Sequence, residues 1–127
     1  MESIIVKVIT TLKKEMKNSM INFDKLEEVT LKNFKGGDGS IIAKIFTDGN
    51  NKIMKATLRK GCSIGMHIHD MSSEIIYVLS GVASCVIDGR DETIKKDECH
   101  YCPKGSTHSL KNNNDEDLIV LCVVPNQ

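Results

Sequence analysis

Three histidines and one glutamate are the residues of this chain whose types and order could do chemistry. His67 and His69 are two positions apart, Glu74 follows five residues later, and His108 lies in the unit CPKGSTHSLKN. Alternate residues of an extended strand leave the same face, so His67 and His69 would point the same way. Imidazole and carboxylate suit a divalent transition metal ion such as Mn, Fe, Zn, Ni or Co. Four such ligands leave two positions of an octahedral ion for substrate or water.

The length and charge of the chain exclude several classes of partner. The chain has 127 residues and a formal net charge of zero, with 17 basic and 17 acidic side chains. This length suits one domain with one core, and the balanced charge argues against nucleic acid or an anionic membrane as partner. The longest apolar run, 118–124, has the length of a strand and not of a membrane span. The first residues lack the features of a secretory signal, so we expect a cytoplasmic protein.

Five cysteines without an export signal predict free thiols in a reducing compartment. Cys99 and Cys102 form a C-x-x-C pair, but residues three apart in a strand face opposite sides, and no second pair accompanies them. We therefore expect two separate, semi-buried thiols instead of a zinc or redox site. Cys62 is the thiol nearest in sequence to the histidine pair.

Short β-branched runs separated by turn residues predict an all-β domain. Besides the histidine strand, the expected strands are 41–47, 52–58, 74–80, 82–88, 92–95, 98–102, 107–111 and 118–124. The joining turns at 48–51 and 88–91 contain Asp, Gly and Asn, which tolerate positive φ angles, and 112–116 is expected to be a solvated loop. Without alternating helices, this spacing predicts an antiparallel sandwich or barrel. In 74–80 both alternating faces are largely apolar, so one should line the barrel and the other needs another layer or another subunit.

The segment 1–21 is expected to be an N-terminal extension to a barrel domain of residues 22–127. Apolar residues recur in it at helical spacing, at Ile5, Ile9, Leu12 and Met16. This pattern favours an amphipathic helix, although the β-branched residues near the start also allow a strand. A translation start at Met16 or Met20 is a further interpretation.

The residues around the histidine pair resemble the first sequence motif of the cupin superfamily. That motif is a glycine, five residues, His-x-His, three or four residues, a glutamate, six residues and a glycine. It is matched without a gap by Gly61, His67, His69, Glu74 and Gly81.

The second cupin motif follows in the expected order. Its Pro-x-Gly, histidine and asparagine positions are occupied by Pro103, Gly105, His108 and Asn112. Its first position, a glycine in the motif, is Asp97 here, which bears on a turn and not on the metal because aspartate also tolerates such backbone. Both motifs in order make the resemblance specific, and the flanking strands extend it over most of the chain after residue 40.

The resemblance implies an all-β fold, a double-stranded β-helix (jelly-roll) barrel with a metal ion held by His67, His69, Glu74 and His108. The chain is similar to small, uncharacterised, single-domain bacterial cupins of the type 2 conserved-barrel kind. Cupins include dioxygenases, sugar-phosphate isomerases, epimerases, decarboxylases and non-catalytic binding proteins, and many are homodimers. The resemblance therefore implies dioxygenase-like or isomerase-like metal-assisted chemistry on a small oxygen-rich molecule. The alternative is a non-catalytic small-ligand-binding or sensor module.

Other polar residues have weaker claims to the site. His100 is expected to support a ligand or lie at the surface, and not to serve as a fifth ligand. Tyr77 and Tyr101 offer hydroxyls to a substrate, although strand tyrosines more often pack with the oxygen at the rim. Arg59 and Lys60 offer positive charge to an anionic substrate at the mouth, or are simply solvated. Neither a Ser-His-Asp triad nor a separate general base is identified.

Overall fold

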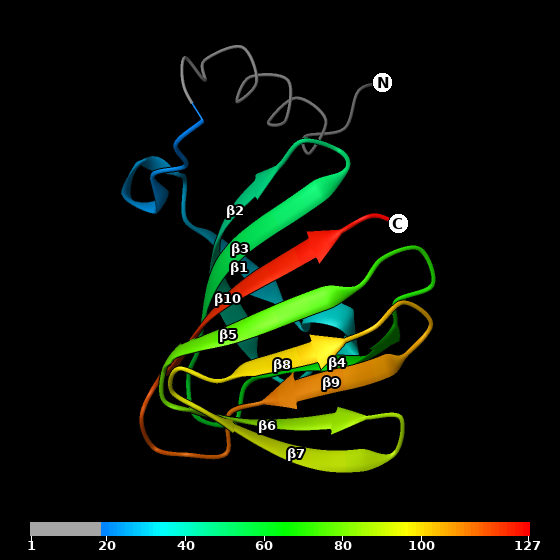
Figure 1. Cartoon of the computed structure of the whole chain (residues 1–127). Coiled ribbons are helices and arrows are strands. Elements are labelled where there is room, and N and C mark those ends of the chain that lie inside the picture. The colour runs from blue at the N-terminus through cyan, green and yellow to red at the C-terminus, as the bar shows by residue number, and fades with distance from the viewer. Residues whose placement is uncertain (1–18) are drawn as a thin grey trace.

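The computed structural model describes residues 19–127, which form two antiparallel sheets that enclose one core (Figure 1). The larger sheet has the order β1 (Val29–Lys32), β2 (Ser40–Thr47), β3 (Asn51–Leu58), β10 (Leu118–Pro125), β5 (Glu74–Ser80) and β8 (Cys99–Cys102). The smaller sheet has the order β4 (Ser63–Ile68), β9 (Thr107–Lys111), β6 (Val82–Ile87) and β7 (Arg90–Lys95). This is the two-sheet barrel that the resemblance implied. The helix expected within 1–21 falls almost wholly outside the described residues.

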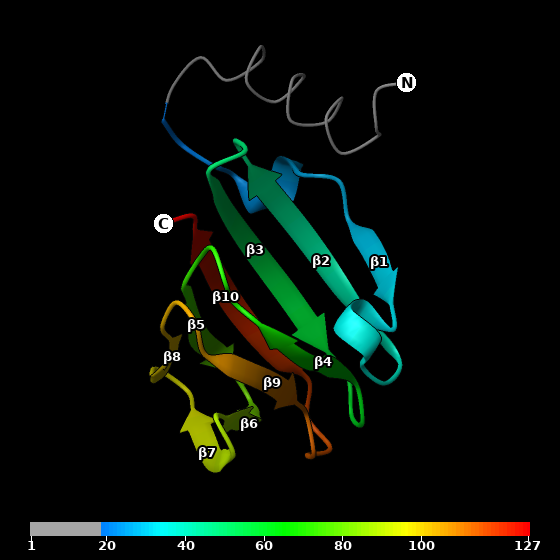
Figure 2. The same ribbon diagram turned by 90° about the vertical axis from the view of Figure 1, so that its right-hand side faces the viewer.

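Figure 2 shows β4 and β9 lying across the concave side of the larger sheet. The facing sides bury an aliphatic core that draws on both sheets, including Ile41, Met54, Leu58, Ile76, Val78, Ala83, Leu110 and Val120. In β5 the buried residues are Glu74, Ile76 and Val78, so this face lines the interior and the opposite face is the outer one. Within residues 19–127, no helix has the length and apolar character that would cross a membrane.

Asp97 takes the left-handed backbone that the second motif assigns to a glycine. Its φ is 69°, and its amide donates to the carbonyl of Val78 at 2.9 Å, which connects the turn after β7 to β5. Aspartate tolerates this conformation better than most residues, so the departure from the motif leaves the turn intact. The carboxylate of Asp97 also accepts a hydrogen bond from the Tyr77 hydroxyl at 2.7 Å.

Two expectations about irregular segments are corrected by the structure. Residues 22–35, for which no strand was predicted, contain β1 and the 3-10 turn η1 (Phe23–Lys25). A second 3-10 turn, η2 (Phe34–Gly36), begins in this segment and ends just after it. The loop 112–116 is exposed except for Asn112, which is fully buried. Its side-chain amide donates to the backbone carbonyls of Leu58 and Glu116, each at 2.8 Å. The buried amide therefore satisfies two backbone acceptors that would otherwise need water.

Candidate metal centre

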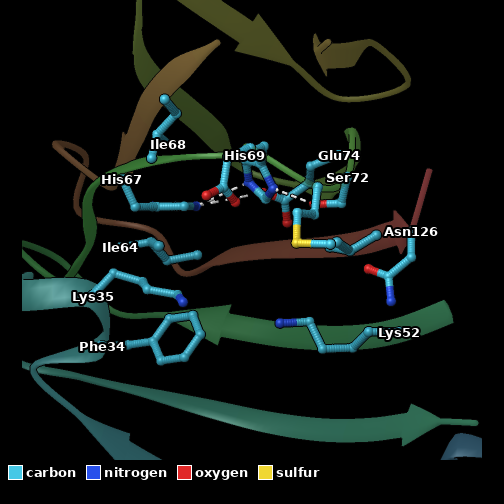
Figure 3. Close-up of a pocket in the computed structure, with 13 residues that line it drawn as sticks. Phe34, Lys35, Lys52, Ile64, His67, Ile68, His69, Ser72, Glu74 and Asn126 are labelled. Carbon is cyan, nitrogen blue, oxygen red and sulfur yellow. Dashed lines mark hydrogen bonds and ion pairs between the residues drawn. The ribbon is translucent and has the colours of Figure 1, made fainter. Parts of the chain in front are cut away.

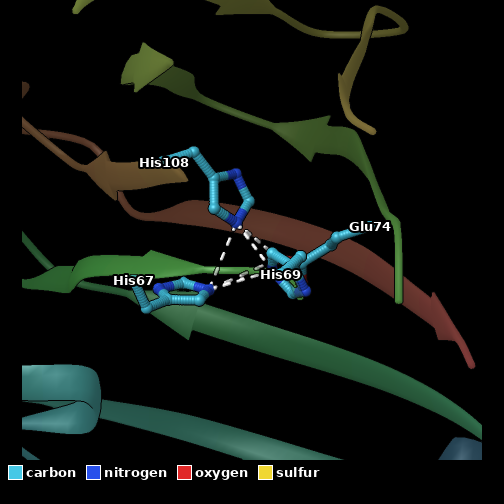
Figure 4. A group of neighbouring side chains, drawn as sticks. All are labelled: His67, His69, Glu74 and His108. Carbon is cyan, nitrogen blue, oxygen red and sulfur yellow. Dashed lines mark hydrogen bonds and ion pairs between the residues drawn. The ribbon is translucent and has the colours of Figure 1, made fainter. Parts of the chain in front are cut away.

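Strands from both sheets bring the four predicted side chains together inside the barrel (Figure 4). His67 on β4 is the cross-strand partner of His108 on β9, and His69 follows the end of β4. Glu74 begins β5 in the opposite sheet. One ligand atom from each of these residues lies within 4.8 Å of the others. This cluster, the metal site below, has a geometry consistent with binding an ion.

The separations between these atoms can be compared with coordination polyhedra. The Nε2 atoms of the three histidines are 3.0, 3.0 and 3.2 Å apart. The Glu74 Oε1 atom is 2.9 Å from Nε2 of His108, 3.1 Å from that of His69 and 3.9 Å from that of His67. At metal–ligand bonds of about 2.1 Å, adjacent octahedral ligands are about 3.0 Å apart, opposite ones about 4.2 Å, and tetrahedral ones about 3.4 Å. The four groups would therefore fit around one octahedral ion, which would leave two positions for other ligands.

Hydrogen bonds on the far side of two rings orient their Nε2 atoms toward the centre. His67 Nδ1 lies 2.7 Å from the carbonyl oxygen of Gly65, and because a carbonyl only accepts, the ring nitrogen donates. A neutral His67 then has an unprotonated Nε2 with its lone pair toward the other ligands. His69 Nδ1 lies 2.9 Å from the hydroxyl of Ser72, which can accept in the same way. Such partners fix the tautomer that a metal requires.

His108 is oriented by a chain of two further side chains. Its Nδ1 is 3.0 Å from Nε2 of His100, and Nδ1 of His100 is 2.9 Å from a carboxylate oxygen of Glu92. The carboxylate accepts from His100, so a neutral His100 presents a lone pair that accepts from His108. His108 Nε2 is then free for an ion. Of the two roles predicted for His100, these contacts agree with support of His108, and its buried ring excludes the surface role.

The charges of the site favour a cation among the rings. Burial raises the pKa of Glu74, but hydrogen bonds with His108 and His69 outweigh it and bring the pKa to about 2, so this side chain is a carboxylate. Burial lowers the pKa of His67, which keeps its ring neutral. A buried carboxylate needs a positive charge nearby. A proton on an imidazole brings positive charge to Glu74 through a single hydrogen bond. A metal ion would bring positive charge to all four groups at once, so the donor set fits a divalent ion.

A cavity of about 290 Å³ opens beside His67, His69 and Glu74 (Figure 3). Its opposite side is formed by Phe34 and Lys35 of η2 together with Lys52 of β3, a set called the lysine wall below. The ammonium nitrogens of Lys35 and Lys52 lie 5.6 and 5.5 Å from the centre of the Phe34 ring.

The positive charge at the cavity comes from Lys35 and Lys52 and not from Arg59 and Lys60. Arg59 and Lys60 follow the far end of β3, whereas Lys52 lies near its start, and the strand separates the two positions. Lys60 forms an exposed ion pair with Asp115 at 2.6 Å and does not line the cavity. Of the two interpretations given for Arg59 and Lys60, the structure supports the solvated one, because both are exposed and neither lines the cavity.

Phe34 and Lys35 of the lysine wall reach the cavity because η2 lies directly against β4. A Cβ atom on Gly65 would collide with the carbonyl oxygen of Lys35, and one on Gly37 would collide with that of Ser63. These are backbone atoms that cannot turn aside, so both positions require glycine. The carbonyl of Gly65 also holds His67, which couples the lysine wall to the metal site through one residue.

The remaining predicted residues lie away from the cavity. Tyr77 binds Asp97 and Tyr101 is 57% exposed, and neither lines the cavity, so a contact between either hydroxyl and a ligand in this cavity is not supported. Cys99 is exposed and Cys102 is buried, so the two thiols are separate as expected, although neither is semi-buried. Cys62 also lies outside the cavity lining.

A cysteine distant in sequence from the histidine pair lies near the metal site. Cys122 on β10 pairs with Ile76 on β5, close to the metal site although distant from it in sequence. Burial raises the pKa of the Cys122 thiol well above its ordinary value, and the Glu74 carboxylate adds to the rise. This thiol is therefore a packing group and not a thiolate ligand.

A family model described as a cupin domain matches residues 54–124. An oxalate-binding protein of Thermotoga maritima is 27% identical over 117 residues, which cover 87% of this chain and 97% of that protein. An uncharacterised protein of Methanocaldococcus jannaschii is 29% identical over 112 residues, covering 84% of this chain and 86% of that protein. Among solved structures, one described as a predicted oxalate decarboxylase from Thermotoga maritima has a TM-score of 0.80 at 24% identity, covering 85% of this chain and 99% of that chain.

Proposed function

Because this chain belongs to the cupin domain family, we propose that it binds one divalent transition metal ion through His67, His69, Glu74 and His108, and that the ion binds a small oxygen-rich ligand. The observation that carries this proposal is the set of atomic separations, which would fit one octahedral ion with two positions left for other ligands. Imidazole and carboxylate ligands suit Mn, Fe, Co, Ni or Zn. Two oxygens of one ligand can occupy those two positions.

Oxalate is the first ligand to test. A relative that covers most of this chain is named an oxalate-binding protein. Oxalate is a small chelator with paired oxygens, and a cavity of about 290 Å³ lies at the lower end of the range for small-molecule sites. The aliphatic side chains of Ile64 and Ile68 also line the cavity and would limit the access of water to the bound ligand.

A metal-assisted reaction, dioxygenase-like or isomerase-like, is the second candidate. The bound ion would polarise the ligand as a Lewis acid. The chain contributes orientation through the hydrogen bonds that fix each histidine, and the Asp70 carboxylate lines the cavity as a group that can accept a proton. Asp70 is the observation that favours turnover over binding alone.

Elemental analysis of untagged protein, as purified, tests the metal site. We expect close to one ion per chain in the wild type and none in His67→Ala and His108→Ala, with retained fold checked by circular dichroism. Equal trace metal in all three proteins would contradict the proposal. Oxygen consumption and carbon dioxide release by the loaded protein with oxalate then separate turnover from binding without turnover.

We also propose that the chain forms a homodimer through the outer face of the larger sheet. Ile75 and Tyr101 are cross-strand partners on β5 and β8 and are 38% and 57% exposed, which leaves apolar surface for a second layer. Light scattering on a sizing column should give twice the chain mass, and Ile75→Glu should give the monomer. A wild-type monomer at high concentration would contradict this.

A further inference from the structure

Resting on the proposed metal site, we infer that the lysine wall selects a ligand with two negative charges. The ligand class is a small dicarboxylate. The ion binds one pair of its oxygens, and Lys35 and Lys52 face the oxygens directed away from the ion.

The ammonium groups of Lys35 and Lys52 both lie beside the Phe34 ring, and neither has a paired carboxylate among the described residues. In Figure 3 both lysine side chains end near the Phe34 ring, across the cavity from His67 and Glu74. Within residues 19–127, the lysine ion pairs are those of Lys60 with Asp115 and Lys111 with Asp38. An aromatic face attracts cations, so Phe34 holds both ammonium groups in a position that their mutual repulsion opposes. An anion placed between them and the ion removes that repulsion.

The charges that line the cavity correspond to a dianion. The charged side chains of the lining are Lys35, Lys52, Asp70 and Glu74, and the histidines are neutral as metal ligands. A divalent ion and two lysines supply four positive charges, and the two carboxylates offset two of them. The remaining two positive charges are balanced by a dicarboxylate, whereas a monoanion leaves one and a neutral chelator leaves both.

The backbone that presents Lys35 is unusual. Asn33 and Lys35 have φ angles of 50° and 55°, in the left-handed region that non-glycine residues seldom occupy. The turn is held by the Asn33 side chain, which donates to the carbonyl of Gly37 at 3.0 Å, and by the close packing of Gly37 and Gly65. Conformations of this kind persist where the surroundings enforce them, and they concentrate at ligand sites.

The lysine wall also comes from a different part of the chain than the metal site. The match to the cupin model covers residues 54–124 and includes all four metal-site residues. Phe34, Lys35 and Lys52 precede that match. Substitutions of Lys35 or Lys52 can therefore change the charge proposed to select the ligand without changing a metal-site residue.

Three ligands of similar shape and different charge test the inference. Isothermal titration calorimetry on Mn²⁺-loaded protein would compare oxalate, oxamate and oxamide, which carry two, one and no negative charges. Lys35→Gln and Lys52→Gln remove charge while they keep a hydrogen-bond donor. Lys55→Gln is the matched control, because Lys55 is exposed on β3 and does not line the cavity.

We expect wild-type protein to bind oxalate more tightly than oxamate, and oxamate more tightly than oxamide. Oxalate affinity should fall roughly tenfold in Lys52→Gln, which is half-buried, and roughly threefold in Lys35→Gln, which is exposed. The ratio of oxalate to oxamate affinity should shrink in both variants. Lys55→Gln should match the wild type in affinity, and all variants should keep one ion per chain.

The outcomes separate this inference from the metal proposal. Full metal loading with unchanged oxalate affinity, an unchanged oxalate-to-oxamate ratio, or no binding of either anion would overturn the inference and leave the metal site standing. Failure of the wild type to hold Mn²⁺ or any other divalent ion would overturn the proposed function and the inference with it.

Discussion

The metal site and the lysine wall face one cavity, but the chain builds them differently. Three of the four metal-site residues are buried, and strand register fixes them, with His67 opposite His108. The lysine wall consists of a short turn with left-handed residues and the start of one strand, and Lys35 is exposed. Rigid sheet therefore positions the groups proposed to hold an ion, and an irregular turn positions part of the lysine wall proposed to face the ligand.

This difference indicates which changes each region tolerates. A substitution in the metal site removes one of four groups whose ligand atoms lie within 4.8 Å of one another, so we expect its effect to reach the other three. A substitution in the lysine wall changes a partly solvated charge and leaves the strands in place. The predictions below are therefore ordered by whether the change is expected to damage both regions, one region or neither.

Gly65→Ala should damage both regions and have the largest effect. A Cβ there collides with the backbone of Lys35 and Gly36, so either η2 moves away or β4 shifts. We expect a loss of about 3 kcal/mol in the free energy of unfolding, together with weaker binding of metal and of oxalate. Urea unfolding and calorimetry measure these quantities.

Gly49→Ala is the control for a general cost of replacing glycine. Gly49 has a φ of 92° with open space around it. The added methyl group should therefore lower the free energy of unfolding by only about 1 kcal/mol and leave the binding of metal and of oxalate unchanged. Equal losses of stability in the two variants would show that the contact between η2 and β4 is unimportant.

His100→Ala should damage the metal site alone. Without His100, the Nδ1 of His108 loses its acceptor and the ring no longer favours the tautomer that binds metal. Metal affinity should fall roughly thirtyfold, measured by competition with a chelator. His100→Gln keeps an acceptor on a side chain of similar reach and should recover part of the loss. Equal losses in both variants would assign His100 a packing role only.

Lowering the pH should weaken the metal site through its imidazoles. Burial lowers the pKa of His67 below 6.5, so the folded chain binds fewer protons there than the unfolded chain, and the free energy of unfolding of the metal-free protein falls as pH drops through that range. Protons also compete with the ion, so metal affinity should fall on the order of tenfold per pH unit once the rings begin to protonate. Glu74, with its pKa lowered to about 2, stays ionised throughout. Metal affinity that is constant from about pH 7.5 to about pH 5 would exclude imidazole ligands.

Alkylation of thiols should leave both regions intact. Cys99 is exposed, whereas burial raises the pKa of Cys85 to about 12 and that of Cys122 well above its ordinary value. Iodoacetamide at mildly basic pH should modify Cys99 in the native protein without loss of metal, and all five cysteines after unfolding. Peptide mass spectrometry distinguishes the two patterns, and rapid native labelling of Cys122 would show that the interior opens.

Local patterns were sufficient to predict most of the barrel and the cluster of four residues. The alternation in 74–80 required that Glu74, Ile76 and Val78 share a face, and that face proves to be the interior. The turn at 88–91 predicted the hairpin of β6 and β7, with Asp88 and Gly89 at positive φ. Both signals depend on neighbours within a few residues, which a sequence displays directly.

The lysine wall could not be predicted because it depends on contacts between distant segments. Lys35 reaches the cavity only when η2 packs on β4 across a pair of glycines, and its left-handed backbone is atypical of lysine. Asn112 was assigned to a solvated loop because its neighbours are polar, but the carbonyl of Leu58, which it binds, is far away in sequence. Lys52 was not singled out from the sequence, since nothing local indicates which end of β3 faces the cavity.

The position of β10 in the larger sheet determines the order in which the molecule can assemble. β10 lies between β3 and β5, and its partners on β3 run from Leu58, opposite Leu118, to Asn51, opposite Pro125. Joining strands so distant along the chain means closing long loops before their contacts form, which makes folding slow. Until β10 inserts, β3 and β5 are open edges that invite association with other chains. The strand that carries Glu74 thus gains one of its two neighbours late, and we expect metal uptake to follow folding instead of guiding it.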